Sequence, residues 1–86
     1  METENNRLIC YEKEINYIAK QIKIMLNLDE VFVEYYPRGL LYRITFVGHP
    51  LFTFRVKIIH LEELIAKSYI TILKEIIYFL IDQMEN

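Results

Sequence analysis

The chain has 86 residues, which corresponds to one domain, 1–86, built around a single hydrophobic core. Apolar residues make up 53% and aromatic residues 14% of it, and this composition excludes an intrinsically disordered chain. The formal net charge of −2 excludes a protein that binds nucleic acid with its whole surface, although it is compatible with a local basic patch.

The cysteine count and the length of the apolar runs indicate in which cellular compartment the protein is expected. Cys10 alone cannot form an intrachain disulfide or a cysteine-rich metal site. The N-terminal sequence METENNR is polar and acidic, unlike a secretory signal. The longest unbroken apolar run, Ile76 to Ile81, is far shorter than the ~20 residues that span a bilayer. We therefore expect a cytoplasmic protein that makes no membrane contact.

The first predicted element is a helix from Arg7 to Leu26. Apolar residues recur at three- and four-residue spacing on one face, whereas charged residues occupy the other. Cys10 lies beside the apolar stripe with no base close in sequence, so we interpret it as structural. Asn27 tolerates a left-handed backbone and is expected to end the helix. The apolar positions are Leu8, Tyr11, Ile15, Ile18, Ala19, Ile22, Met25 and Leu26.

Three strands follow, because apolar and polar residues then alternate between two turns. Matching apolar residues across the turns predicts Val33 opposite Ile44, and Ile44 opposite Phe54. In the first turn, Gly39 is free to take a positive φ. The strands and turns are expected at residues 31–36, 37–39, 40–47, 48–50 and 52–59. The core-facing residues of this register are Val31, Val33, Tyr35, Tyr42, Ile44, Phe46, Phe52, Phe54, Val56 and Ile58.

The last predicted element is a helix from Leu61 to Met84, with no Gly or Pro in 24 residues, either continuous or kinked near Ser68–Thr71. It is apolar over more than half of its circumference, so it needs neighbours on two sides. The sequence therefore predicts an α+β fold of two layers in the order α-β-β-β-α. In this fold a three-stranded antiparallel meander has both helices packed on one face.

The length of the last helix predicts a homodimer. A helix of 24 residues is about 36 Å long, whereas a strand of seven or eight residues is about 25 Å long. The end of the helix should therefore overhang its own sheet by roughly 10 Å, unless a kink near Ser68–Thr71 folds it back. A second copy would cover the overhang. The expected interface residues are Ile77, Leu80, Ile81 and Met84.

The sequence contains no group of residues with the types and spacing of a catalytic, metal-binding or phosphate-binding site. His49 and His60 are separated along an extended strand by roughly 30 Å, so they cannot share a metal ion. Glu62 and Glu63 are adjacent and point in different directions on a helix, where they suit its dipole. The two glycines are isolated turn residues and do not form a phosphate-binding loop. We therefore expect a non-enzyme without a cofactor or a metal.

The sheet face away from the helices is the expected partner-binding surface. The predicted register places Glu34, Arg43 and Arg55 in one row of this face, with Arg43 directly opposite Arg55. Such a pair repels, and an anion from a partner would relieve the repulsion. A solvated face without a partner is the alternative interpretation. The expected partner-binding residues are Phe32, Glu34, Tyr36, Arg43, Arg55 and Lys57.

The order of elements resembles that of the double-stranded RNA-binding domain. That family begins its last helix with basic, alanine-rich sequence, whereas this chain has Leu61-Glu62-Glu63-Leu64, which argues against the same function. The order is also similar to that of some small phage-encoded anti-CRISPR inhibitors, without a shared motif. Neither resemblance assigns the chain to a family.

These observations favour a small protein-binding module that acts by occupying a partner macromolecule. Residues with AT-rich codons, such as isoleucine and asparagine, far outnumber glycine, alanine, arginine and proline. Such a bias is common in viruses and mobile elements, which suggests an anti-defence inhibitor or regulator. The alternative is a nucleic-acid-binding regulator that uses the basic and aromatic sheet face.

Overall fold

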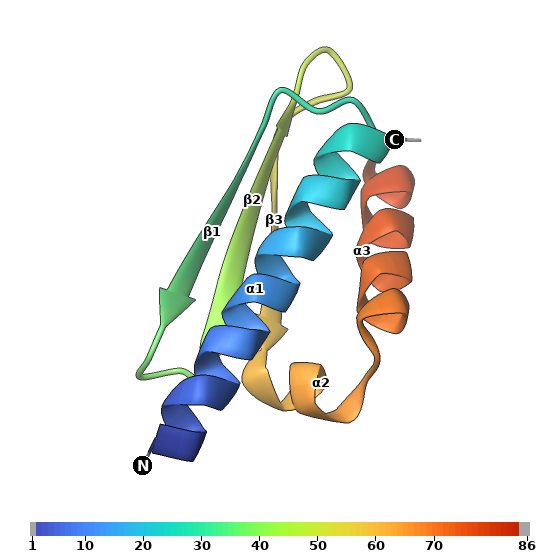
Figure 1. The fold of residues 1–86 in the computed structure, drawn as a ribbon. Helices are drawn as coiled ribbons and strands as arrows, with labels where there is room; N and C mark the ends of the chain where they lie inside the picture. The colour runs from blue at the N-terminus through green and yellow to red at the C-terminus, as the bar shows by residue number, and fades with distance from the viewer. Residues whose placement is uncertain (1, 85–86) are drawn as a thin grey trace.

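The computed structural model describes residues 2–84, with side chains for residues 11–84. It has the predicted α+β fold: one helix, a three-stranded antiparallel sheet and a second helical segment, with the helices on one face of the sheet (Figure 1). The second helical segment is divided in two. The elements are α1 Glu2–Met25, β1 Glu30–Tyr36, β2 Leu41–Gly48, β3 Phe52–His60, α2 Leu61–Ala66 and α3 Tyr69–Met84.

Helix α1 ends as its sequence predicts. Asn27 has a φ of 53°, the left-handed conformation typical of the residue that follows a helix. This turn lets the backbone N–H of Leu28 donate to the carbonyl oxygen of Lys23 at 2.9 Å. Leu28 then packs into the core. The helix begins at Glu2, five residues before the predicted start.

Strands β1 and β2 pair in the predicted register. Tyr35 lies opposite Tyr42, Val33 opposite Ile44, and Val31 opposite Phe46. The core-facing side chains of the central strand are buried, whereas the alternate residues are partly exposed. The alternation of apolar residues was therefore sufficient to define this half of the sheet.

The predicted register between β2 and β3 is wrong. Ile44 lies opposite Lys57, and Phe46 lies opposite Arg55, because a β-bulge interrupts the pairing between Phe46 and Gly48. Phe52 and Ile59 both face the core, although seven residues apart they would lie on opposite sides of a regular strand. One extra residue at the bulge resolves this conflict.

The bulge reverses the facing of most of β3. Phe54, Val56 and Ile58, which were predicted to be core residues, lie on the open face of the sheet. Arg55 and Lys57 lie on the helix-facing side. The charged end of Arg55 lies over the Phe52 ring and that of Lys57 over the Phe79 ring, which offsets part of the cost of placing them on this side.

The last predicted helix, Leu61–Met84, is not continuous but breaks between α2 and α3, which corresponds to the alternative of a kink near Ser68–Thr71. Lys67 has an extended backbone, with φ −116° and ψ 151°. The hydroxyl of Ser68 accepts a hydrogen bond from the backbone N–H of Thr71 at 3.3 Å, which is the usual cap of a new helix. Lys67 Nζ bridges the break by an ion pair with Glu75 at 3.1 Å.

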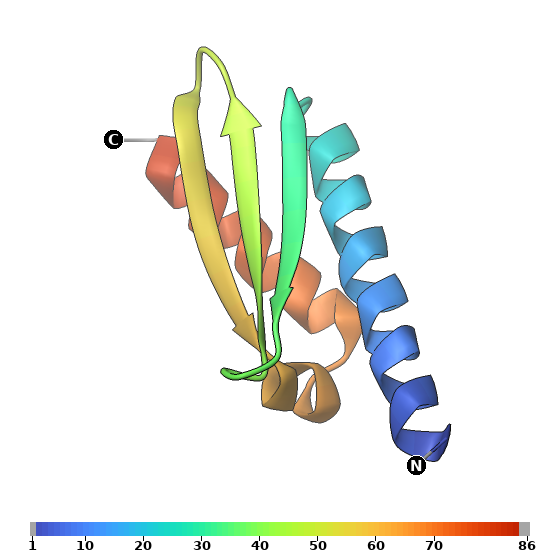
Figure 2. The same ribbon diagram turned by 90° about the vertical axis from the view of Figure 1, so that its left-hand side faces the viewer.

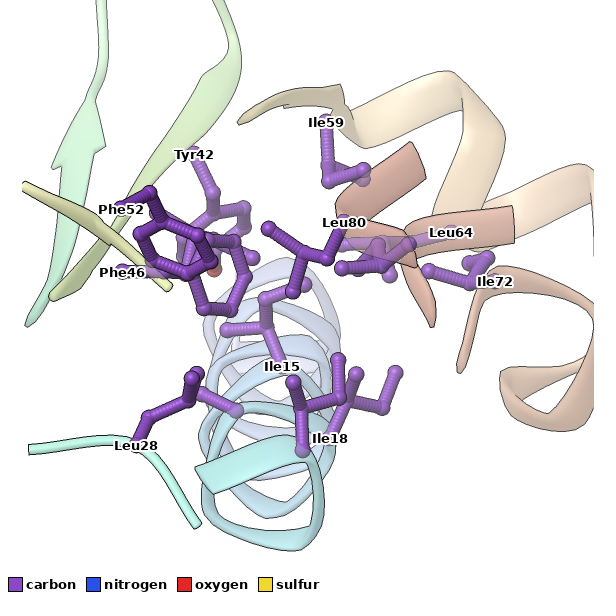
Figure 3. Packing of buried hydrophobic residues seen from close by; sticks show 14 residues of the cluster. Ile15, Ile18, Leu28, Tyr42, Phe46, Phe52, Ile59, Leu64, Ile72 and Leu80 are labelled. Carbon is purple, nitrogen blue, oxygen red and sulfur yellow. The ribbon is translucent and has the colours of Figure 1, made fainter. Parts of the chain in front are cut away.

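The break allows α3 to fold back beside α1, so that both helices cover the same sheet face (Figure 1). Ile72, Ile76 and Leu80 of α3 are completely or almost completely buried. Side chains from β2, β3 and all three helices meet in one core (Figure 3), and Val31, Val33 and Tyr35 of β1 pack against it. Labelled examples are Ile15, Ile18, Leu28, Tyr42, Phe46, Phe52, Ile59, Leu64, Ile72 and Leu80.

Candidate functional site

The sheet face opposite the helices is uncovered over the described part of the chain (Figure 2). We call it the outer face. It carries the alternate residues of each strand, arranged in cross-strand rows. Two of these rows are Phe32–Thr45–Val56 and Glu34–Arg43–Ile58.

The outer face is mainly apolar along β2 and β3. Phe54 is 56% exposed and Ile58 is 38% exposed, so these side chains place hydrocarbon in water. Phe32 on β1 is similarly exposed and lies in the same row as Val56. Large contiguous apolar patches are unusual on a monomeric protein surface and often mark a binding site. We define the outer strip as Thr45, Val47, Phe54, Val56 and Ile58.

An ion pair borders the outer strip on the β1 side. Arg43 Nη2 donates to Glu34 Oε1 at 2.7 Å, and the guanidinium lies 5.5 Å from the centre of the Tyr36 ring. The hydrogen bond from Arg43 lowers the pKa of Glu34, with a smaller contribution from the Tyr36 hydroxyl. Both contacts hold the guanidinium of Arg43 on the β1 side of the outer face. Its positive charge therefore does not lie over β3.

The predicted row of opposed arginines does not exist. Arg43 lies opposite Ile58, whereas Arg55 lies opposite Phe46 on the other side of the sheet. Arg55 sits 5.4 Å from the Phe52 ring and donates to the carbonyl oxygen of Phe54 at 2.8 Å. The predicted anion bound across the two guanidinium groups is therefore excluded by the register.

Lys57 is likewise on the helix-facing side and not on the outer face. Its Nζ lies 5.4 Å from the centre of the Phe79 ring of α3. Of the six predicted partner-binding residues, the structure thus groups Phe32, Glu34, Tyr36 and Arg43 on the outer face. Arg55 and Lys57 lie behind it, along the β3 edge.

Both edges of the sheet are protected against pairing with a strand of another molecule, whereas the outer face is not covered. Charged residues that point inward on an edge strand oppose pairing with another strand, since such pairing would bury them. Arg55 and Lys57 have this arrangement on β3. Helix α1 packs along β1 at the other edge (Figure 2). The chain therefore discourages strand addition while leaving an apolar face open.

An open hollow of about 310 Å³ lies at the end of β3, next to α2. His60 closes β3 and lines the hollow together with Leu40 and Ile65. Leu40 has a φ of 49°, so the left-handed conformation expected at Gly39 falls on the next residue. This hollow could not be predicted from the sequence, because it depends on how α2 meets the turn between β1 and β2.

The structure removes the basis of the predicted dimer interface. Leu80 is fully buried in its own chain and cannot contact a second copy. Ile77 and Met84 are partly buried against the same core, and only Ile81 is exposed. Because α3 folds back onto the sheet, the overhang that the interface required is absent.

The other candidate residues that the sequence singled out are the two histidines and Cys10. His49 lies in the turn after β2 and His60 at the far end of β3. The side chain of Cys10 lies outside the described residues. In the described part of the chain, no group of three or more His, Cys, Asp or Glu residues could hold a metal ion. Within the same residues, no helix is long and apolar enough to span a membrane.

Comparison of the chain with models of protein families, with curated proteins and with solved structures gave no match in any of the three cases. The function is therefore inferred from the surface that the fold presents.

Proposed function

We propose that this chain is a small non-enzymatic protein-binding module that acts by occupying a partner macromolecule through its outer face. The observation that carries the proposal is the exposed apolar outer strip on a sheet whose other face is fully used by the core. Burial of apolar area drives most protein association, and aromatic residues such as Phe54 and Phe32 are typical of interface centres.

A protein partner is favoured over nucleic acid by the charges of the outer face. Arg43 is the one lysine or arginine on the outward positions of the three described strands, and it is paired with Glu34. A nucleic-acid surface needs several cations to contact phosphates. Arg55 and Lys57 cannot supply these cations, because both lie on the helix-facing side of the sheet.

The proposed biological role is an inhibitor or regulator encoded by a virus or a mobile element. The small size and the bias toward AT-rich codons support this origin. The predicted homodimer lost its basis when the last helix proved to be broken between Ala66 and Tyr69, so the proposed binding unit is a single chain.

The experiment compares two surface variants in capture of proteins from lysate of the source cells. Phe54→Asp places a charge on the outer face, and Tyr78→Asp places one on the exposed surface of α3. We expect the native chain and Tyr78→Asp to retain the same partner, and Phe54→Asp to lose it. Both variants should keep the native circular dichroism spectrum, because both side chains are more than half exposed.

Two outcomes would overturn the proposal. Retention of the partner by Phe54→Asp would show that the outer face is not the binding surface. Recovery of nucleic acid, with affinity that falls steeply as salt increases, would favour the nucleic-acid-binding alternative.

A further inference from the structure

We propose that the hollow at the end of β3 takes one arginine or lysine side chain of the partner protein. The aliphatic stem of that side chain lies against Leu40 and Ile65, and its charged end meets the carboxylate of Glu62. This inference rests on the proposed function and adds a second point of contact with a stated chemistry. It follows from the lining of the hollow, from the charge of Glu62, from the backbone of Leu40 and from the place of the hollow beside the outer face.

The lining of the hollow combines apolar side chains with one carboxylate. Leu40 is 55% exposed and Ile65 is 64% exposed, so both place hydrocarbon in water where they line the hollow. The volume of about 310 Å³ is at the small end of the range for ligand sites, roughly 300–1,000 Å³. A long side chain with an apolar stem and a charged end matches this lining in size and in polarity. The lining residues are Gly39, Leu40, His60, Leu61, Glu62 and Ile65.

Glu62 supplies the charge that selects a cation. Its side chain is exposed in the first turn of α2. Among the described residues, neither Arg38 in the nearby turn nor any other cation lies within ion-pair distance of its carboxylate. The adjacent Glu63, in contrast, accepts hydrogen bonds from the backbone N–H of His60 and from Lys67. A guanidinium or ammonium group of the partner provides the counter-charge for Glu62.

The backbone of Leu40 has a conformation that residues other than glycine rarely adopt. Its φ is 49°, although Gly39, which could take such a φ without strain, immediately precedes it. The carbonyl oxygen of Leu40 accepts a hydrogen bond from the backbone N–H of Leu61 at 2.8 Å, which ties this turn to the start of α2. Strained residues of this kind cluster at binding sites, where they hold a side chain in position before the ligand arrives. The strained leucine gives the hollow an apolar wall that a glycine would not provide.

The hollow adjoins the outer face, which favours a protein partner over a free small cation. Tyr36, Leu41 and His60 form the last cross-strand row of the outer face, two residues along β3 from Ile58. His60 therefore belongs both to the outer face and to the lining of the hollow. An open hollow covers little of a small molecule, whereas ligand sites usually bury roughly 70–90% of theirs. A protein that lies on the outer strip can cover the opening with its own surface.

The first test titrates three small probes into the isotope-labelled chain at pH 8 and follows the amide signals by NMR. n-Propylguanidinium reproduces the arginine side chain, butanoate joins the same propyl stem to a carboxylate, and guanidinium lacks the stem. We expect n-propylguanidinium to shift the signals of Leu40, Glu62 and Ile65 with a Kd of about 1–10 mM. The other two probes should bind at least tenfold more weakly, and equal binding of all three, or of none, would overturn the inference.

Substitutions in the hollow test the charge and the apolar wall separately. Glu62→Gln should weaken binding of n-propylguanidinium at least tenfold, because it removes the charge and keeps the size of the side chain. Glu12→Gln changes an exposed carboxylate on α1 and is the matched control, so it should bind as the native chain does. Leu40→Gly removes a wall and relieves the backbone, so binding should weaken while the Tm holds or rises. Native affinity in Glu62→Gln or in Leu40→Gly would overturn the inference.

Capture of the partner separates this inference from the proposed function. We expect Glu62→Gln to bind the captured partner at least tenfold more weakly than the native chain does, and Glu12→Gln to bind it normally. If Phe54→Asp loses the partner while Glu62→Gln keeps full affinity, the inference fails and the proposed function stands. Probe binding that depends on Glu62 without any effect on capture would indicate a site for a free small cation, which also overturns the inference. If Phe54→Asp keeps the partner, the proposed function itself fails.

Discussion

The facing of β3 can be tested at two neighbouring isoleucines, Ile58 and Ile59. Ile59 is 1% exposed and Ile58 is 38% exposed, although a regular strand in the register first predicted would bury Ile58. Truncation to alanine removes three carbons in each case, worth about 0.8 kcal/mol apiece when fully buried. Ile59→Ala also leaves a cavity and should lower the free energy of unfolding by about 3–4 kcal/mol. Ile58→Ala opens no cavity and should cost about 1 kcal/mol.

Urea denaturation, followed by circular dichroism at 25 °C, measures both costs on the same scale. If Ile59→Ala leaves too little folded protein, Ile59→Val and Ile58→Val repeat the comparison with a smaller deletion. Equal costs, or a larger cost at Ile58, would show that the β-bulge is absent and that the outer face has been assigned to the wrong residues.

Three further predictions concern the core, the end of α1 and the start of α2. Ile44→Ala should lower the free energy of unfolding by about 2–5 kcal/mol and Thr45→Ala by much less, as measured by urea denaturation; equal losses would contradict the central strand's facing. Asn27→Ala should cost about 1 kcal/mol in the same assay whereas Asn27→Gly should not, because only alanine resists the φ of 53°. Burial alone would raise the pKa of Glu63, but hydrogen bonds from the His60 N–H and from Lys67 lower it on balance. Its contribution is therefore complete above the ordinary pKa of 4.5 and is lost as the pH falls through the lowered value, so Glu63→Ala should cost about 1 kcal/mol at pH 7 and progressively less as the pH falls below 4.5; a loss that is independent of pH would refute this role.

The parts of the fold that local pattern determines were predictable from the sequence. Regular alternation defined the register of β1 with β2, and Asn27 marked the end of α1. The break before α3 has a local signal at the position where a kink was the alternative, since Ser68 precedes Thr71 by the three residues of a helix cap. Apolar periodicity continues through the break and concealed it.

The bulge in β3 could not be derived from alternation alone. Phe54, Val56 and Ile58 form a better apolar face than Arg55 and Lys57, so the pattern favours the wrong side. The observed facing follows from tertiary contacts: Ile59 is buried in the core, and the charged ends of Arg55 and Lys57 lie over the Phe52 and Phe79 rings. The candidate site changed as a result from a basic row to an apolar strip.

The most direct test of the outer face as the binding surface is site-specific photo-crosslinking in cells that express the native gene. A photoreactive benzoylphenylalanine replaces either Phe54, which is 56% exposed on the outer face, or Tyr78, which is 66% exposed on α3. The two positions are matched in size and exposure and lie on opposite layers. We predict a discrete adduct with a second protein from position 54 and none from position 78. An adduct from position 78 alone would contradict the assignment of the outer face.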